Sequence, residues 1–297
     1  MTKTILTLEQ ALTLPYATQR FVQLGWRVIR IESPPDTETG RGGDPNRYIG
    51  EDTGVDNLHS YYIPPNLGKE AITLNLKTSE GHELLKKIIA ELGVDVFMCN
   101  TLPKRYEQLG IDYNSLLEAN PALIWCGISA YGPEYPDMTG YDPALQAAMG
   151  YMHLTGEPDR DPMLCGLPLI DLRAGDEAFT QVLLAMLEQQ SDQAIKGKEI
   201  HISMAQCAAS WLITALPQLA FTDDPDRIFA RSANEHRSVN PCNCCPTKDG
   251  YVCLAIGNDI QWSKLTQIEG FDHLYSDARK TNQGRDDDKV NIYADIR

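Results

Sequence analysis

Short apolar runs alternate with amphipathic helical segments through the first 132 residues of this 297-residue chain. The run Trp26–Glu32 is rich in β-branched residues, and Val94–Cys99 and Ala122–Gly132 have the same character. Between the first two runs, Gly81–Gly93 places leucines and isoleucines at helical spacing before a glycine stop. Strands and helices that alternate in this way form a parallel sheet with helices on both faces. The sequence therefore predicts an α/β fold.

Further segments extend this pattern toward the C-terminus. Residues 9–24 are predicted to be helical, and Ala71–Thr78 alternates as a short strand. Glu199–Phe221 predicts a strand that runs into a long apolar helix. Beyond Phe221 the chain becomes polar and loop-like before an alternating strand at Gly250–Asn258. We therefore expect two domains, a large one at 1–221 and a small one at 222–297.

Charge and hydropathy exclude several classes of function. The formal net charge is −15, and nucleic-acid phosphates require a basic face, so a nucleic-acid partner is not expected. A few local lysines and arginines can still hold a small polyanion. No apolar run is long enough to cross a bilayer, and the N-terminus lacks a cationic start followed by an apolar block. We expect neither a membrane span nor a signal peptide, and hence a cytoplasmic protein.

The eight cysteines do not resemble a disulfide framework. Five of them are scattered among apolar residues, as free thiols in a reducing compartment are. The other three, Cys242, Cys244 and Cys245, are clustered, but no further histidine or cysteine pair stands at zinc-finger spacing. We expect no metal site.

A glycine-rich tetrapeptide, Gly40–Gly43 (GRGG), offers a possible phosphate-binding loop. A dinucleotide-binding fingerprint requires a strand, a tight turn and a helix in immediate succession. Here the glycines come well after the strand, and no helical pattern follows them. The segment is not interpreted as a dinucleotide site.

Asp171 stands where the apolar run Gly166–Ile170 gives way to a helical pattern that is clear after Gly175. A carboxylate at such a place can cap the helix by accepting backbone N–H bonds. It can also act as a partly desolvated nucleophile or base at the carboxyl end of a strand. On the local residues alone the cap is the commoner role, and both interpretations remain open.

Six stretches in order resemble the class III CoA-transferases, the family of formyl-CoA and crotonobetainyl/carnitine CoA-transferases. They are LGWRVIRIESP with GDPNR, NLGKEAITLNLKTSEGHELL, VDVFMCNTLPKRYEQLGIDY, NPALIWCGISAYGP, YDPALQAAMGYMHLTGEPDRDP, and PLIDLRAG before a helix. The resemblance covers residues 8–297. It implies a Rossmann-like CoA-binding large domain, a smaller α+β domain and an interlocked homodimer. Because members of the family continue beyond the segment where this chain stops, the second domain is expected to be C-terminally incomplete.

The resemblance also implies an activity, the reversible transfer of CoA from an acyl-CoA donor to a free carboxylic acid. The family's nucleophilic aspartate matches Asp171, whose carboxylate would carry CoA as an aspartyl thioester. The small neighbours Gly166, Ala174 and Gly175 are expected to leave room for the acyl group. CoA and acyl-CoA are then substrates, and no tightly bound cofactor is expected.

CoA-binding positions carried over from the family are spread along the first half of the chain. The backbone at Ala11 and Leu12 would lie beside the thioester, and Lys77 would face the phosphates. Tyr131 and Tyr141 match positions that line the acyl pocket. The remaining expected contacts are Ser33 and Leu74 and three basic residues. Arg47 would substitute for a basic residue that the family commonly has at the position of Ser33, and Lys104 and Arg105 would replace a family arginine that matches Gln108.

Two alternatives remain. The related α-methylacyl-CoA racemases place a histidine where this chain has Tyr141, and a tyrosine with its ordinary pKa near 10 is a poor base at neutral pH. His153 stands twelve residues later, away from that position. The second alternative is an inactive CoA-binding partner subunit. The residues do not indicate which acids are donor and acceptor.

Overall fold

The computed structural model describes residues 2–192 and 196–296, and the chain divides into two compact units. The first unit comprises Met1–Met149 and Gly166–Leu212, and the second comprises Gly150–Cys165 and Ile213–Arg297. The main division between the two units falls after Leu212. The sixteen residues Gly150–Cys165, from the middle of the chain, belong to the unit that contains the C-terminal part. The domain boundary expected near Phe221 stays a prediction.

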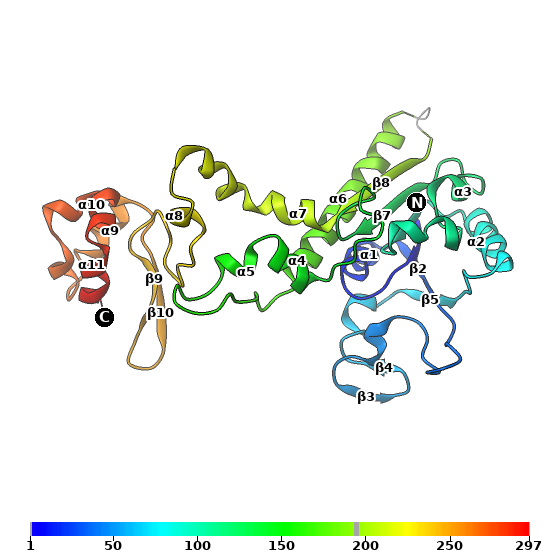
Figure 1. The fold of residues 1–297 in the computed structure, drawn as a ribbon, viewed down its shortest axis with the longest axis horizontal. Coiled ribbons are helices and arrows are strands. Elements are labelled where there is room, and N and C mark those ends of the chain that lie inside the picture. Colours follow the sequence, from blue (N-terminus) through cyan, green and yellow to red (C-terminus); the bar gives the residue numbers. More distant parts are fainter. Residues whose placement is uncertain (1, 193–195, 297) are drawn as a thin grey trace. The chain divides into compact units, whose positions relative to one another are not determined.

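A six-stranded parallel sheet forms the centre of the first unit (Figure 1), as the alternation predicted. Its strand order is β5-β2-β1-β6-β7-β8. From β1 the chain runs outward through β2 and β5, then returns to the other side of β1 with β6. The order therefore reverses between β1 and β6, the place where ligands bind in open α/β sheets. The strands are β1 (Thr4–Leu8), β2 (Arg27–Glu32), β5 (Glu70–Thr73), β6 (Val96–Cys99), β7 (Ile124–Ser129) and β8 (Lys198–Ser203).

Helices pack on the sheet through alternate residues of its strands. Leu6, Phe97 and Trp125 share one buried cluster with Leu85 and Ile89 of α2 (Ser79–Leu92). Elsewhere in the unit α1 (Thr13–Gln23) packs against α6 (Leu169–Ser191), where the rings of Phe21 and Phe179 lie 4.7 Å apart. The remaining elements of this unit are β3 (Asp52–Val55), β4 (Leu58–His59), α3 (Tyr113–Leu117), α4 (Asp142–Ala148) and α7 (Met204–Trp211).

Several element boundaries differ from the prediction. Residues 4–8, which precede the predicted first helix, form the central strand β1. The strand predicted at Ala71–Thr78 ends at Thr73, and the chain turns away there. Helix α6 begins at Leu169 rather than after Gly175, so Asp171 lies inside its first turn. The long helix predicted up to Phe221 ends at Trp211 and continues as short 3₁₀ segments, where Pro217 lacks the N–H that a helix needs.

The second unit is a small α+β assembly. Its antiparallel hairpin consists of β9 (Cys242–Pro246) and β10 (Tyr251–Ala255), of which only β10 was predicted. A core of Trp262, Leu265, Leu274 and Ile292 holds the C-terminal helices together. The guanidinium of Arg231 donates to the carbonyl of Glu157 at 3.0 Å and of Arg160 at 2.8 Å, which attaches residues 150–165 to this unit. Its helices are α5 (Tyr151–Leu154), α8 (Asp226–Phe229), α9 (Asp259–Leu265), α10 (Asn282–Asp287) and α11 (Lys289–Ile296).

Across the described ranges 2–192 and 196–296, none of the helices combines the length and apolar character that a membrane span requires.

Candidate active site

Two adjoining cavities open at the carboxyl ends of the parallel strands in the first unit. One, of about 350 Å³, contains Asp171 and is called the Asp171 cavity. The other, of about 600 Å³, contains Lys77 and is called the Lys77 pocket. Gln10, which follows β1, and Thr101 and Leu102, which follow β6, line both cavities. The two cavities therefore meet at the point where the strand order reverses, and a ligand too large for either can extend through both.

Asp171 does not cap its helix, because the carboxylate of Asp142 accepts the hydrogen bonds of the first N–H groups. Oδ2 of Asp142, on α4, accepts from the backbone N–H of Ile170 at 2.7 Å and of Asp171 at 3.2 Å. The side-chain amide of Gln146 donates to the other Asp142 oxygen at 2.5 Å, and Asp142 is only 4% exposed. The N-cap position of α6 is Pro168, whose side chain accepts nothing. Asp142 thus provides the acceptor for two N–H groups at the start of the helix, and the Asp171 carboxylate is left to make other contacts.

The Asp171 carboxylate is partly buried and has one hydroxyl partner. The pKa of Asp171 is raised to about 6, mainly by burial and also by the nearby Asp142 carboxylate, while a hydrogen bond from Thr13 opposes the rise. That bond runs from the Thr13 hydroxyl to Oδ1 of Asp171. At neutral pH the carboxylate is ionised but poorly hydrated, which is the state that a carboxylate nucleophile requires.

Close contact between α1 and α6 brings Thr13 to Asp171. A Cβ at Gly175 would lie 2.8 Å from the Thr13 carbonyl oxygen and 2.7 Å from the Tyr16 ring, so only glycine allows this approach. Ala174 is fully buried, and a Cβ at Gly166 would meet nothing within 4 Å. The small residues around Asp171 were expected to make room for an acyl group. In the structure Gly175 instead sets the distance between two helices.

The segment after β1 is fixed in an unusual conformation beside Asp171. Ala11 lines the Asp171 cavity with φ of 60°, a region that non-glycine residues rarely occupy. Asp44 accepts from the Ala11 N–H at 3.1 Å, and Asn46 donates to the Ala11 carbonyl at 2.7 Å. The side-chain amide of Asn100 accepts from the Gln10 N–H at 3.0 Å and donates to the Gln10 carbonyl at 2.8 Å. Four side-chain hydrogen bonds thus hold the backbone of two consecutive residues, Gln10 and Ala11, at the junction of the cavities.

A buried group of charges supports Asp44. Arg30 is 1% exposed and lies 2.9 Å from Asp44, 3.3 Å from Glu32 and 3.8 Å from Glu9. Lys69 pairs with Glu9 at 2.7 Å and Arg47 pairs with Glu32 at 2.7 Å, so three cations face three carboxylates. Removing one member of such a group leaves an uncompensated buried charge. The group therefore holds Asp44 in place, and Asp44 in turn holds the backbone of Ala11.

The Lys77 pocket is lined by basic, acidic and apolar residues. Of its carboxylates, Glu9 pairs with Lys69 and Glu32 pairs with Arg47 within the protein, and the third is Asp36. Lys77, Arg105 and Arg41 supply its positive charge, and Ser33 and Leu74 also line it. Arg41 belongs to the glycine-rich tetrapeptide that the sequence analysis set aside. Because Glu9 and Glu32 already have cationic partners, the three cations outnumber the remaining carboxylate, Asp36, and the pocket suits a polyanionic ligand.

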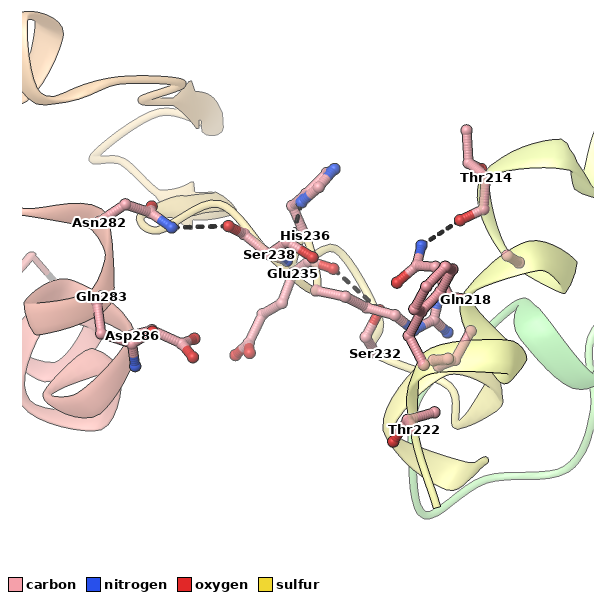
Figure 2. A pocket seen from close by; sticks show the side chains of 14 residues that line it. Thr214, Gln218, Thr222, Ser232, Glu235, His236, Ser238, Asn282, Gln283 and Asp286 are labelled. Atoms are coloured by element: carbon pink, nitrogen blue, oxygen red, sulfur yellow. Dashed lines mark hydrogen bonds between the residues drawn. The ribbon is translucent and has the colours of Figure 1, made fainter. Parts of the chain in front are cut away.

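A third cavity, of about 500 Å³, lies within the second unit, and Figure 2 shows its polar lining. Glu235, Asp286 and His236 are among its residues, and the amide of Asn282 donates to the Ser238 carbonyl at 2.8 Å. Its charges are of both signs, so it favours no single class of ligand.

Comparison with known proteins decides the family. The profile described as CoA-transferase family III matches residues 3–297. The chain belongs to this family. It is 32% identical to the succinate--glutarate CoA-transferase of Agrobacterium fabrum, with 97% of this chain and 71% of that protein aligned. It is 28% identical to the succinyl-CoA:glutarate CoA-transferase of Homo sapiens, covering 95% of this chain and 62% of that one. A CAIB/BAIF family protein from Brucella suis has a similar structure, with a TM-score of 0.81, 30% identity, and coverage of 98% and 75%.

Members of CoA-transferase family III transfer CoA between acyl thioesters and carboxylic acids, and the positions carried over from the family can now be located. Ser33, Leu74, Lys77 and Arg105 line the Lys77 pocket. Ala11 and Tyr141 line the Asp171 cavity, where Tyr141 is 72% exposed. Their roles in binding stay predictions.

Four other positions lie outside the residues that line these cavities. Arg47 is held by Glu32 at 2.7 Å and by the Tyr62 hydroxyl at 2.8 Å. Lys104 forms an ion pair with Asp137 at 2.8 Å. The Tyr131 ring lies against Tyr135, and Leu12 precedes α1, where its carbonyl accepts from Tyr16. Arg47 and Lys104 are therefore occupied by carboxylates of the protein itself.

Sequence reasoning missed the residues that position Asp171. Asp142 was visible only as half of the Tyr141–Asp142 dipeptide, and Arg41 only as part of the glycine-rich tetrapeptide. Thr13 and Asn100 give no local signal, because each acts through a partner far away in the sequence.

The second acid/base group that a racemase needs is not found beside Asp171. No histidine is among the described residues that line the Asp171 cavity, and His153 belongs to the second unit. Within residues 2–192 and 196–296, no cluster of histidine, cysteine and carboxylate side chains is arranged to hold a metal ion.

Proposed function

We propose that this protein transfers CoA reversibly from an acyl-CoA to a free carboxylic acid through an aspartyl-CoA thioester on Asp171. The observation that carries the proposal is the position of Asp171. Its carboxylate has a pKa raised to about 6, mainly by burial. Asp142 caps the helix in its place, and the carboxylate opens into a cavity that adjoins the Lys77 pocket with its three basic residues.

The proposed reaction has four balanced steps. A carboxylate oxygen of Asp171 attacks the acyl-CoA carbonyl, and the C–S bond breaks. This step releases CoA as its thiolate and forms a mixed anhydride between Asp171 and the donor acid. The thiolate then attacks the aspartyl carbonyl, which gives the aspartyl-CoA thioester and releases the donor acid as its carboxylate. The acceptor carboxylate attacks this thioester to form a second anhydride and CoA thiolate. Attack of the thiolate on the acceptor's carbonyl gives the new acyl-CoA and restores Asp171. No water is needed, and each step preserves an activated acyl group.

Thr13 and Asp142 prepare the nucleophile in this proposal. The Thr13 hydroxyl engages Oδ1 of Asp171 and leaves the other oxygen available to attack. Asp142 fixes the backbone that carries Asp171, because it binds the N–H groups of residues 170 and 171. The start of helix α6 also favours a negative charge on its first turn.

CoA is proposed to lie with its phosphates in the Lys77 pocket and its thioester in the Asp171 cavity. Lys77, Arg105 and Arg41 offer three cations to the phosphates. Gln10 and Leu102 line both cavities, so the pantetheine arm would pass between these two residues. The site of strand-order reversal supports this placement, since open α/β sheets bind extended ligands there.

Short carboxylic acids are the proposed acyl groups. The Asp171 cavity holds about 350 Å³, and the side chains of Thr13, Asn100, Ser129 and Thr139 line it together with apolar residues such as Ile128 and Met204. Two relatives are named for succinate or succinyl-CoA and glutarate. Dicarboxylates of this size are therefore the first donors and acceptors to test.

The test is a transfer assay between succinyl-CoA and a panel of labelled dicarboxylic acids. The parent should convert at least one labelled acid into its CoA thioester, while Asp171→Asn should lose this transfer. Lys104→Ala serves as the matched control, because Lys104 pairs with Asp137 outside the pocket. Transfer by Asp171→Asn at the parent rate would contradict the proposal. Deuterium uptake from D₂O into a 2-methylacyl-CoA, without any acceptor acid, would favour the racemase alternative.

The interlocked homodimer remains a proposal that rests on the family. Light scattering after gel filtration tests it directly, and a mass of about twice 33.1 kDa is expected. CoA binding without transfer, with activity restored by an added partner chain, would instead favour the CoA-binding subunit.

A further inference from the structure

Two cysteines face each other across the hairpin of the second unit. In the antiparallel register of β9 and β10, Cys244 is paired directly with Cys253. Cys253 is exposed and Cys244 is half-buried, so solvent reaches this pair. The chemistry proposed for Asp171 uses neither residue.

The backbone bonds at both ends of the hairpin show which kind of pair this is. The Thr247 N–H donates to the Gly250 carbonyl at 2.8 Å, and the Ile256 N–H donates to the Pro241 carbonyl at 3.0 Å. Hydrogen-bonded and non-hydrogen-bonded pairs alternate along an antiparallel ladder. Counting inward from either end in the observed register makes Cys244 and Cys253 a non-hydrogen-bonded pair. The backbone of Cys242, two residues earlier, agrees, because it bonds to Tyr293 and His236 rather than to β10.

This kind of pair brings the two side chains closest together. Its Cα atoms lie about 4.5 Å apart, against about 5.5 Å in a hydrogen-bonded pair. Disulfides span Cα separations of about 4.4–6.8 Å, so a bond can form here without moving the strands apart. The two side chains already influence each other, since partial burial and the neighbouring Cys253 thiol raise the pKa of Cys244.

The neighbouring cysteines are less well placed. Cys242 lies on the same face but opposite Ala255, which makes it a diagonal neighbour of Cys253 at about 7–8 Å. Cys245 points to the other face of the strand and is 4% exposed. Elsewhere, burial raises the pKa of Cys99 to about 12 and that of Cys207 to about 11, which keeps these thiols protonated and inert.

We propose that Cys244 and Cys253 form a reversible dithiol/disulfide site that responds to peroxide. The exposed Cys253 thiolate attacks hydrogen peroxide, the O–O bond breaks, and Cys253 becomes a sulfenic acid while hydroxide leaves. The Cys244 sulfur, which gives up its proton, then attacks the Cys253 sulfur, and the sulfenic oxygen departs as water. Two thiols and one peroxide thus give one disulfide and two waters. A low-molecular-weight thiol reverses the change by exchange.

Peptide mapping of the full chain tests this site. Lys248 lies between the two strands, so trypsin separates residues 238–248, which hold Cys244, from residues 249–264, which hold Cys253 alone. After peroxide treatment and alkylation of free thiols, the two peptides should remain joined, lighter by two hydrogens, until dithiothreitol separates them. Fragmentation of the joined peptides identifies the cysteine bonded to Cys253 without any substitution.

Two variants provide matched controls. Cys242→Ser should retain the cross-link, whereas Cys244→Ser should reduce it about tenfold, because the remaining partner on that face is diagonal. Separate peptides with Cys253 fully alkylated in the treated parent would overturn the proposal. An undiminished cross-link in Cys244→Ser, or a bond assigned to Cys242, would overturn it as well.

Discussion

The Asp142 carboxylate accepts hydrogen bonds from the backbone N–H groups of Ile170 and Asp171, so one aspartate caps the helix that carries the other. This arrangement separates two roles that a single aspartate at a helix start would otherwise combine. Asp142 is 4% exposed and also binds Gln146, whereas Asp171 opens into the cavity. The nearby Asp142 carboxylate also contributes to the raised pKa of Asp171.

Replacing Asp142 with alanine should loosen the start of α6. Two backbone N–H groups lose their acceptor, which should lower the free energy of unfolding by about 1–3 kcal/mol. Asp142→Asn keeps an oxygen acceptor at the same place and should lose much less. Thermal unfolding of the two variants compares these effects. Equal losses of stability in both would mean that the carboxylate's charge, and not its capping bonds, is what stabilises the helix.

Removing the Thr13 hydroxyl should make Asp171 harder to ionise. Thr13→Val keeps the shape of the side chain but removes the donor that opposes the raised pKa of Asp171. The pH midpoint for formation of the aspartyl adduct should rise by about one unit, with the rate at high pH least affected. Thr13→Ser restores a hydroxyl and should return the midpoint to that of the parent. An unchanged profile in Thr13→Val would show that this contact does not tune the nucleophile.

Asp171 should reduce the stability of the folded protein at neutral pH. Its folded pKa of about 6 lies above the ordinary aspartate value, so the folded protein binds a proton that the unfolded chain has released. Stability is therefore lost as the pH rises from about 4 through about 6. Asp171→Asn removes the ionisation, and should be more stable than the parent by about 1–2 kcal/mol at neutral pH, a value reduced by the partial exposure of the group.

Denaturant unfolding of parent and Asp171→Asn across this pH range measures that difference. The two proteins should have equal stability near pH 4 and diverge toward pH 7. A variant less stable than the parent at neutral pH would show that Asp171 is ionised at no cost to folding.

The cations of the Lys77 pocket should control CoA affinity. Lys77→Ala and Arg105→Ala should each raise the Kd of CoA by about tenfold, because each removes one charge-assisted contact to phosphate. Lys104→Ala changes charge equally but lies outside the pocket, so its Kd should match the parent's. Calorimetric titration with CoA distinguishes the variants. A loss of affinity in Lys104→Ala as large as in the other two would indicate a general charge effect.

The parallel α/β fold could be predicted from the sequence because single segments show by their own residue pattern whether they form a strand or a helix. The β-branched run at residues 26–32 and the helical spacing at 81–93 specify one strand and one helix without reference to the rest of the chain. The central strand β1 was missed, since five residues before a predicted helix give little periodicity. Likewise β9 was obscured by its cysteines, although strand alternation buries Asn243 and Cys245 on one face.

The candidate site residues came from the resemblance to the CoA-transferase family and not from local pattern. The family's nucleophile and phosphate-facing lysine match Asp171 and Lys77, whereas the local residues alone favoured a helix cap for Asp171. The partners Thr13 and Asp142 could not be identified, because their roles depend on packing between segments that are distant in sequence. Arg47 shows another limit of local reasoning, since this loop arginine pairs with the buried Glu32, and its contact with CoA stays a prediction.

The measurement that tests the central proposal most directly is the intact mass of the protein after mixing with succinyl-CoA and a panel of other acyl-CoAs. The parent should gain the mass of CoA less water, hydroxylamine should release it, and Asp171→Asn should gain nothing. An adduct of the same mass on Asp171→Asn, or none on the parent in the presence of an acyl-CoA that it uses for transfer, would contradict an aspartyl-CoA thioester on Asp171.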